Sequence, residues 1–289
     1  MSITTRWELN ITALSPISHR AETVGTTALL RRMKIVGADG QVELIPVISG
    51  NSLRGVLRRI GEELLRDVLG YDGMLPLAVA HALRNGGAIT RTTAEPITGA
   101  RLRELRTLIP QLSVFGGAIG AAPIDGCLKV GHVIPVIDEA RPLLRGDYPL
   151  PLPSRFDVET IESYSHLDDT HPDTIAATAV AADSPTPASV LMRYDIETLA
   201  AGTRFESWIH LGRGSALDHA FLTDVLGEFG RRGWLGGRTG IGHGHIHTTN
   251  TETEHHAAGP DVDAPPLDWR THLREHRDDA LTVLAGLTR

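Results

Sequence analysis

The chain has 289 residues, with 28 Lys and Arg against 35 Asp and Glu, which gives a formal charge of −7. Hydrophobic residues make up 41% and charged residues 22%, a balance that excludes a wholly disordered chain and predicts one large domain or two modest ones. The single cysteine, Cys127, excludes an intrachain disulfide and a cysteine-based zinc site. No stretch is apolar enough to span a bilayer, and the first residues carry no secretory signal, so we expect a cytoplasmic protein without membrane contact.

Charge is distributed unevenly along the chain. Residues 1–130 carry 15 basic and 11 acidic groups, whereas residues 131–200 carry 4 and 12. The acid is therefore concentrated in a segment that reads as loop, and the parts predicted to be structured are mildly basic. Because the local field steers a polyanion more than the net charge does, a phosphate-binding face is compatible with the negative total.

The first half of the chain contains strand and helix patterns in turn. Residues 7–14 alternate as a strand, with Trp7, Leu9, Ile11 and Ala13 on one side. Residues 18–36 read as a loop or extended arm that holds several basic residues. The further elements expected are a strand at 42–48, a helix that Asn51 or Ser52 can cap and that ends near residue 69, helices at 77–84 and 100–112, and a strand at 128–136.

The second half opens with an acidic, proline-rich excursion at residues 138–188. The elements expected after it are a hairpin of strands 190–196 and 203–211, a helix at 215–230, a glycine-rich loop, a strand at 245–249, a linker at 250–266 and a closing amphipathic helix. Without the insertions the order is strand, helix, strand, strand, helix, strand. That order is typical of an α+β ferredoxin-like fold, in which two helices cover one face of an antiparallel sheet.

The stretch from Ile48 to Arg58, ISGNSLRGVLR, is the first candidate site. Gly50 allows a tight turn, and we expect free backbone N–H groups at the following helix start to point outward, where they would suit a phosphate. Arg54 and Arg58 lie four residues apart on one helical flank and could add charge to the same anion. The alternative is an ordinary capped helix with solvated arginines.

The second candidate is the run from Gly236 to Gly244, with Arg238 among its five glycines. Such a run favours close backbone approach to a ligand or to another chain element, and it lacks the Gly-Lys-Ser or Gly-Lys-Thr ending of an NTPase loop. A flexible turn between helix and strand is the alternative.

His243, His245 and His247 would share one face of a strand, with His255 and His256 nearby, as a metal tripod requires. No Asp or Glu lies within the 243–247 run, and we expect no functional metal there.

The segments 48–58, 112–117 (LSVFGG) and 236–244, in this order, resemble the RAMP superfamily of CRISPR-associated proteins, and most of all the repeated backbone subunit of type IV effectors. The resemblance implies an RRM-like palm with an extended thumb, stacked with further copies of itself into a helical filament along single-stranded guide RNA. It also implies other effector-complex subunits as partners, target nucleic acid as a further one, and antiviral or anti-plasmid defence as the purpose. The palm would comprise residues 1–137 and 189–249, with 138–188 as the thumb-like or flexible insertion and 250–289 as linker and C-terminal helix. The RNA-binding residues that the resemblance implies are Arg20, Arg31, Arg32, Lys34, Ser49, Gly50, Asn51, Ser52, Arg54, Arg58, Gly237, Arg238 and Gly240.

One departure from the family bears on mechanism. In type III relatives an aspartate between the first strand and first helix cleaves RNA, whereas residues 20–30 here contain no Asp, and Glu22 comes too early to match. We therefore expect a binding subunit without nuclease activity and without a cofactor. With only 4% aromatic residues, RNA would be held by its backbone, not by base stacking on the sheet. Two alternatives remain: a RAMP-type RNA-processing endonuclease that uses His19 or His243, and a metal-dependent hydrolase that uses the 243–247 histidines.

Overall fold

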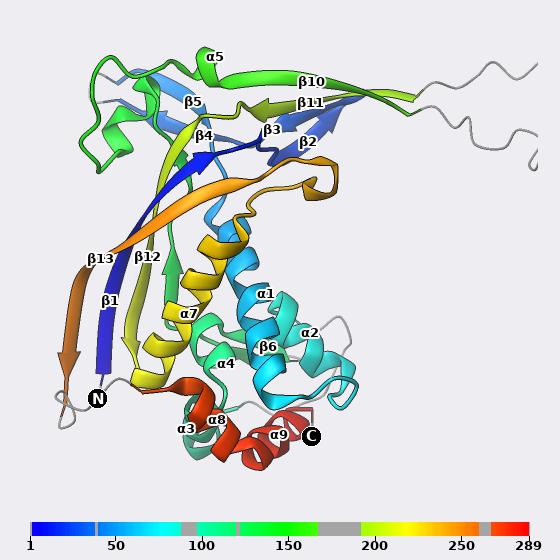
Figure 1. The fold of residues 1–289 in the computed structure, drawn as a ribbon, viewed down its shortest axis with the longest axis vertical. Coiled ribbons are helices and arrows are strands. Elements are labelled where there is room, and N and C mark those ends of the chain that lie inside the picture. The colour runs from blue at the N-terminus through cyan, green and yellow to red at the C-terminus, as the bar shows by residue number, and fades with distance from the viewer. Residues whose placement is uncertain are drawn as a thin grey trace, which may run out of the picture.

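The computed structural model describes residues 2–37, 40–87, 97–119, 122–166, 192–259 and 267–288. Figure 1 shows three long strands that connect a helical body to a layer of strands above it, which we call the wing. The long strands are β1 (Ser2–Ala13), β12 (Arg204–Gly214) and β13 (Ile246–Ala258). The body holds α1 (Gly50–Leu69), α2 (Leu77–Asn85), α3 (Gly99–Leu108), α4 (Pro110–Phe115), α7 (Ala216–Arg232), α8 (Trp269–Glu275) and α9 (Arg277–Gly286). Among the described residues, none of the helices is both long and apolar enough to cross a membrane.

The central sheet has the strand order of a ferredoxin-like fold. Its neighbours are β13, β1, β12 and β8 (Leu128–Val130), each pair antiparallel, and β9 (Ile134–Pro135) also pairs with β12. Once the wing strands between residues 20 and 46 are set aside, helix α1 follows β1; helix α7 follows β12, and the two helices pack together over the sheet. The predicted fold class, an α+β ferredoxin-like palm with an antiparallel sheet and inserted helices, is confirmed.

Local sequence explains the two best-predicted elements. Burial alternates along β1, and the predicted face of Trp7, Leu9, Ile11 and Ala13 is buried. Helix α1 begins where the side chain of Ser49, and not Asn51 or Ser52, accepts an N–H of the first turn. It ends at Gly70, which has a φ of 60°, a left-handed conformation that glycine adopts at least cost.

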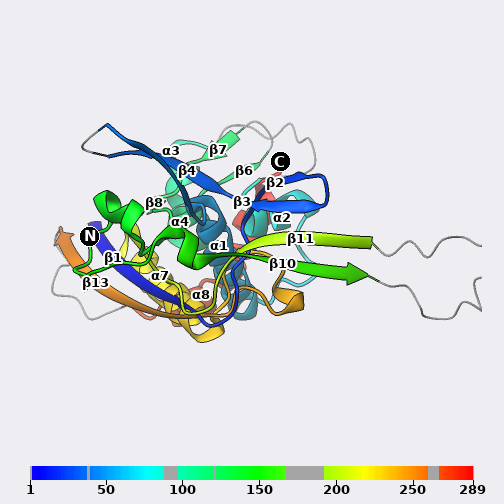
Figure 2. The ribbon, with the colours of Figure 1, turned by 90° about the horizontal axis from the view of Figure 1, so that it is seen from above.

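The wing consists of a four-stranded sheet and a hairpin (Figure 2). The sheet orders β10 (Glu159–His166), β11 (Met192–Leu199), β3 (Thr27–Leu30) and β2 (Arg20–Val24), and the hairpin joins β4 (Arg32–Val36) to β5 (Val42–Pro46). The prediction of a loop or arm at 18–36 was therefore wrong. Strand β3 pairs with β11, 168 positions further along the chain, and local patterning cannot show such a partner.

The described part of the 138–188 excursion contains the short helices η1 (Asp138–Leu143) and α5 (Arg155–Val158) and strand β10. Residues 167–188 lie outside the described residues. A further small hairpin in the body joins β6 (Gly117–Ile119) to β7 (Ala122–Ile124), and a 3-10 turn, η2 (Thr239–Ile241), lies in the glycine-rich loop.

Three other expectations needed correction. The expected hairpin does not form, because β11 pairs in the wing while β12 pairs in the central sheet. The expected linker from residue 250 continues as β13 to Ala258, and residues 260–266 lie outside the described part. The expected 100–112 helix divides at Ile109, because Pro110 has no N–H to continue the α3 ladder and starts α4 instead.

Candidate nucleic-acid interface

The start of α1 is a closed structure. A Cβ on Gly50 would lie 2.8 Å from the carbonyl oxygens of Val130 and Gly131, so only glycine fits there. The N–H of Ser49 donates to His19 Nε2 at 3.1 Å, and the N–H of Gly50 donates to His132 Nδ1 at 2.9 Å. The expectation that these amides point freely outward was wrong, because two histidine rings already accept from them.

His19 is suited to that acceptor role. Burial, the nearby Arg31 cation and His132 all lower the pKa of His19, which favours the neutral ring. A neutral ring has the lone pair that the Ser49 N–H requires.

Arg54 and Arg58 also point into the protein. Arg54 donates to the carbonyl oxygens of Leu128 (2.6 Å) and Phe115 (2.8 Å). Arg58, only 7% exposed, donates to the carbonyl oxygens of Gly116 (2.8 Å) and Phe115. Burial, with the neighbouring Arg54 cation, lowers the pKa of Arg58 to about 10, so it stays charged at neutral pH. The two arginines thus fasten α1 to the turn after α4.

That turn is the 112–117 motif noted in the sequence. Gly116 has a φ of 60°, and a Cβ there would lie 2.3 Å from the carbonyl oxygen of Ile124. The first two sequence motifs are therefore one structural unit, in which arginines of one segment bind carbonyls of the other.

Three surface hollows lie in a row beside this unit. The first, of about 460 Å³, extends from Asn51 to Gly86; the second, of about 290 Å³, shares Arg59 and Arg84 with it. The third, of about 340 Å³, lies next to the second, because Gly236 lines the second hollow and Gly237 lines the third. We call these hollows the basic row. The charged residues that line it are Arg20, Arg54, Arg58, Arg59, Arg84, Arg232 and Arg238, against Glu63 and Glu197.

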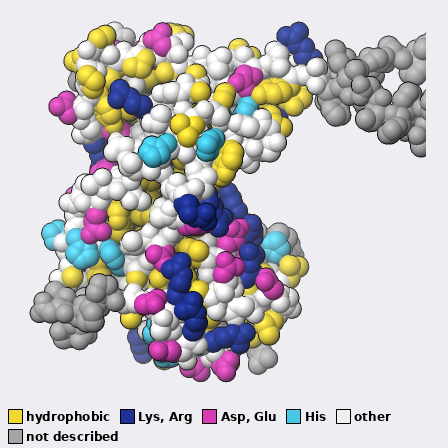
Figure 3. Space-filling view, in the orientation of Figure 1, with side chains coloured by type: hydrophobic (Ala, Val, Ile, Leu, Met, Phe, Trp, Pro, Cys, Tyr) yellow, Lys and Arg dark blue, Asp and Glu magenta, His cyan; other side chains and the backbone are white. Residues whose placement is uncertain are grey.

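Not all of these cations are available to a ligand. Arg84 bonds Glu62 and Glu63, and Arg232 bonds Glu63 and Glu228. Figure 3 shows this mixture, with Lys and Arg side chains over the body below the wing and acidic groups between them. Arg32, expected at the interface, binds Glu159 through both terminal nitrogens at 2.5 and 2.9 Å, and these bonds raise its pKa.

Among the predicted site residues and the residues that line the basic row, five cations are exposed and not bonded to an acceptor. None of them has a hydrogen bond or an ion pair from its side chain within the part of the chain that the structure describes; they are Arg20, Arg31, Lys34, Arg59 and Arg238. Sequence reasoning found all except Arg59, which follows Arg58 directly but faces the solvent. The only available signal was that a helix turns by about 100° between consecutive residues.

The glycine-rich loop lies at the far end of the basic row. The loop packs closely against another segment of the chain, at Ser18. A Cβ on Gly236 would lie 2.8 Å from the carbonyl oxygen of Ser18. The hydroxyl of Ser18 donates to the carbonyl oxygen of Gly237. Arg238 has a φ of 59° and lies over the ring of Tyr194 at 5.2 Å. Tyr194 in turn stacks on Tyr164 with ring centroids 5.5 Å apart, an aromatic pair across β10 and β11 that the composition did not lead us to expect.

The three histidines at the end of this loop and on the strand after it do not converge. His243 is 2% exposed, and its Nε2 lies 2.6 Å from the Tyr164 hydroxyl and 2.8 Å from a Glu162 oxygen. His245 packs on Trp234, and His247 is exposed on β13. A metal tripod at 243–247 is excluded by this arrangement, and with it the hydrolase alternative based on that tripod.

Comparison with known proteins identifies the class. The family model of the RAMP superfamily matches residues 11–247, and the chain belongs to that superfamily. The chain is also similar to a chain of a solved structure named "Type IV-B CRISPR Complex". The two are 35% identical, the match covers 93% of this chain and 98% of that one, and the TM-score is 0.64. A search of curated proteins gave no match. The resemblance expected from the three motifs is confirmed.

Proposed function

We propose that this chain is the backbone subunit of a type IV CRISPR effector, binds single-stranded guide RNA, and assembles with further copies and other subunits into a helical filament. The superfamily and the similarity to a type IV-B complex chain support the class. The observation that carries RNA binding is the basic row, whose lining includes three exposed arginines, Arg20, Arg59 and Arg238, without a hydrogen bond or ion pair among the described residues. Such a filament would present the guide to a target nucleic acid of a virus or plasmid.

The free cations are the proposed phosphate ligands. Arg20, Arg59 and Arg238 line the row, while Arg31 and Lys34 lie exposed on the segments after β2. Asn51 and Ser52 add hydrogen-bonding groups to the first hollow. Gly240 leaves exposed backbone beside Arg238, whereas the N–H and the carbonyl oxygen of Gly237 are both bonded to Ser18.

The other predicted site residues have a different part in this proposal. Arg32, Ser49, Gly50, Arg54 and Arg58 shape the surface, because their polar groups are already bonded within the chain. Phosphate contacts of this kind carry no sequence information, which suits a subunit that must accept any guide.

Self-assembly is supported by the exposed face of the β4–β5 hairpin. Val36 pairs with Val42 and Lys34 with Leu44, so these four side chains share one face. The three apolar ones are 64%, 53% and 48% exposed. Phe156, 74% exposed, lies on α5 next to Arg155, which donates to the carbonyl oxygen of Leu44. Contiguous exposed apolar groups of this kind are typical of protein interfaces.

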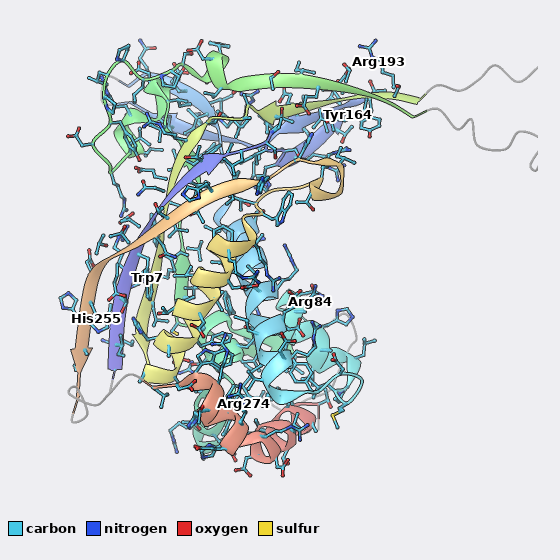
Figure 4. The ribbon with its side chains drawn as sticks, viewed as in Figure 1. Trp7, Arg84, Tyr164, Arg193, His255 and Arg274 are labelled. Carbon is cyan, nitrogen blue, oxygen red and sulfur yellow. The ribbon has the colours of Figure 1, made fainter. Side chains whose placement is uncertain are left out.

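RNA binding is tested by fluorescence anisotropy of a labelled, unstructured RNA over a range of salt concentrations. Affinity should fall with salt, and Arg59→Ala or Arg238→Ala should each reduce the slope of log K against log salt by about 0.7, the value for one phosphate contact on a single strand. Arg274→Ala is the matched control, because Arg274 is exposed on α8 and lines none of the three hollows (Figure 4). Salt-independent binding, or equal effects of all three variants, would contradict the proposal.

We also propose that the chain has no nuclease activity of its own. Glu22 lies on β2, where every residue is exposed and no second acidic group is near in sequence. His19 is occupied by the Ser49 N–H, and His243 is buried between Tyr164 and Glu162, so neither ring is free to reach a ribose hydroxyl. This part would be overturned if the wild type cleaved bound RNA and if Glu22→Ala, His19→Ala or His243→Ala abolished that cleavage.

A further inference from the structure

A cluster of two histidines and a glutamate lies outside the basic row. His219 on α7 and Glu252 and His255 on β13 each offer a ligand atom, and all of these atoms lie within 4.8 Å of one another. Of the three, none lines a hollow of the basic row. The cluster differs from the 243–247 histidines considered from the sequence.

A β-bulge produces this arrangement. Trp7 pairs with Glu252, but Arg6 pairs with Glu254, so β13 holds one extra residue at this point. Residues three apart on a regular strand face opposite sides. Here the bulge turns Glu252 and His255 to the same face as their partners Trp7 and Thr5, which is the face that α7 covers. Figure 4 shows Trp7 and His255 on these neighbouring strands.

The side chain of His219 reaches this face from the first turns of α7. Its ring stacks on Trp7 with centroids 5.5 Å apart and meets His255 edge-on at 5.2 Å. The Nε2 atom of His219 is buried and has no hydrogen-bond partner among the residues that the structure describes. A buried ring nitrogen without a partner is costly, and a metal ion is one of the few ligands that would satisfy it.

The ligand atoms are close enough to converge on one metal ion after a small shift of the side chains. His219 Nε2 lies 3.6 Å from a Glu252 carboxylate oxygen, and the other Glu252 oxygen lies 3.0 Å from His255 Nδ1. Ligands about 2.0 to 2.2 Å from a zinc ion are about 3.3 to 3.6 Å apart at tetrahedral angles, so the 3.6 Å separation fits and the 3.0 Å separation would have to widen by about 0.3 Å. Two imidazoles and a carboxylate are a donor set that Zn²⁺ prefers over Mg²⁺ or Ca²⁺.

We propose that His219, Glu252 and His255 bind one Zn²⁺, which fastens the edge strand β13 to α7 and leaves its fourth position to water. The side chains of Glu252 and His255 are 40% and 42% exposed, so the ion can enter from solvent. Within the described part of the chain, β13 pairs with β1 alone, and the metal would add a second attachment at the bulge, where the ladder is interrupted.

The test uses the full chain, first stripped of metal with a chelator. One equivalent of Zn²⁺ should bind by calorimetry and raise the thermal midpoint, and Co²⁺ should give the strong visible absorption of a four-coordinate site. His255→Gln, a change at a half-exposed residue, should weaken Zn²⁺ affinity at least about tenfold. Glu252→Gln should do the same.

His247→Gln and His256→Gln are the matched controls, because both histidines are exposed on the same strand. Zinc binding that the controls weaken as much as His255→Gln would show adventitious histidine binding only and overturn the proposal. Absence of a thermal shift in the wild type would also overturn it. Neither result bears on RNA binding, which does not depend on this site.

Discussion

Arg58 and Arg59 are adjacent in the chain and are expected to respond oppositely to substitution. Arg58 is buried and bonds carbonyl oxygens of the turn after α4, whereas Arg59 is exposed and unpaired among the described residues. Arg58→Ala should therefore destabilise the fold, and Arg59→Ala should weaken RNA binding without affecting the fold. Comparing the two variants therefore distinguishes an arginine that stabilises the fold from one that binds phosphate.

The magnitude follows from the contacts that Arg58 loses. A hydrogen bond to a charged group contributes about 1.5 to 3 kcal/mol, and Gly116 loses its bond entirely, while Phe115 keeps the one from Arg54. The buried methylene groups add about 0.8 kcal/mol each. We expect Arg58→Ala to lower the free energy of unfolding by about 3 to 5 kcal/mol. Arg59→Ala should change it by less than about 0.5 kcal/mol.

The assay is urea unfolding followed by circular dichroism, beside the RNA titration at a temperature where each variant is folded. Arg58→Met keeps an apolar side chain and should recover part of the lost stability. The difference between Arg58→Met and Arg58→Ala then measures the contribution of packing, separately from that of the hydrogen bonds. An unchanged urea midpoint for Arg58→Ala together with loss of RNA binding would refute this reasoning and make Arg58 a direct ligand.

Two other predictions concern stability. Gly50→Ala should lower the free energy of unfolding by about 1 to 3 kcal/mol, because the added Cβ would overlap two carbonyl oxygens. Gly55→Ala, whose Cβ would have its nearest atom 3.5 Å away, should raise the free energy of unfolding by about 0.5 to 1 kcal/mol. Urea midpoints measure both changes, and equal effects of the two variants would contradict the packing argument. Hydrogen bonds from Arg231 and Arg232 lower the pKa of Glu228 to about 2 from its ordinary 4.5, so this carboxylate stabilises the fold above pH 4.5 and loses that contribution as the pH falls toward 2. The difference in urea midpoint between wild type and Glu228→Gln should shrink across that interval, and a constant difference would exclude the linkage.

The family resemblance needed no tertiary information. Three short motifs, each with the residues that its local geometry requires, were enough to indicate the superfamily. What the motifs did not show is the direction of their side chains. Arg54 and Arg58 looked like phosphate ligands by spacing, but the neighbouring α4 turn supplies the carbonyl oxygens that bind them.

The sequence alone determined the elements whose stability is local: α1, with its helical apolar spacing, and β1, with its alternation. Only the tertiary structure decided what depends on distant partners. The wing strands, the length of the polar strand β13 and its bulge all exist because another segment completes their hydrogen bonds. The His219–Glu252–His255 cluster is the clearest case, since two of its members are three apart on a strand and only the bulge turns them to one face.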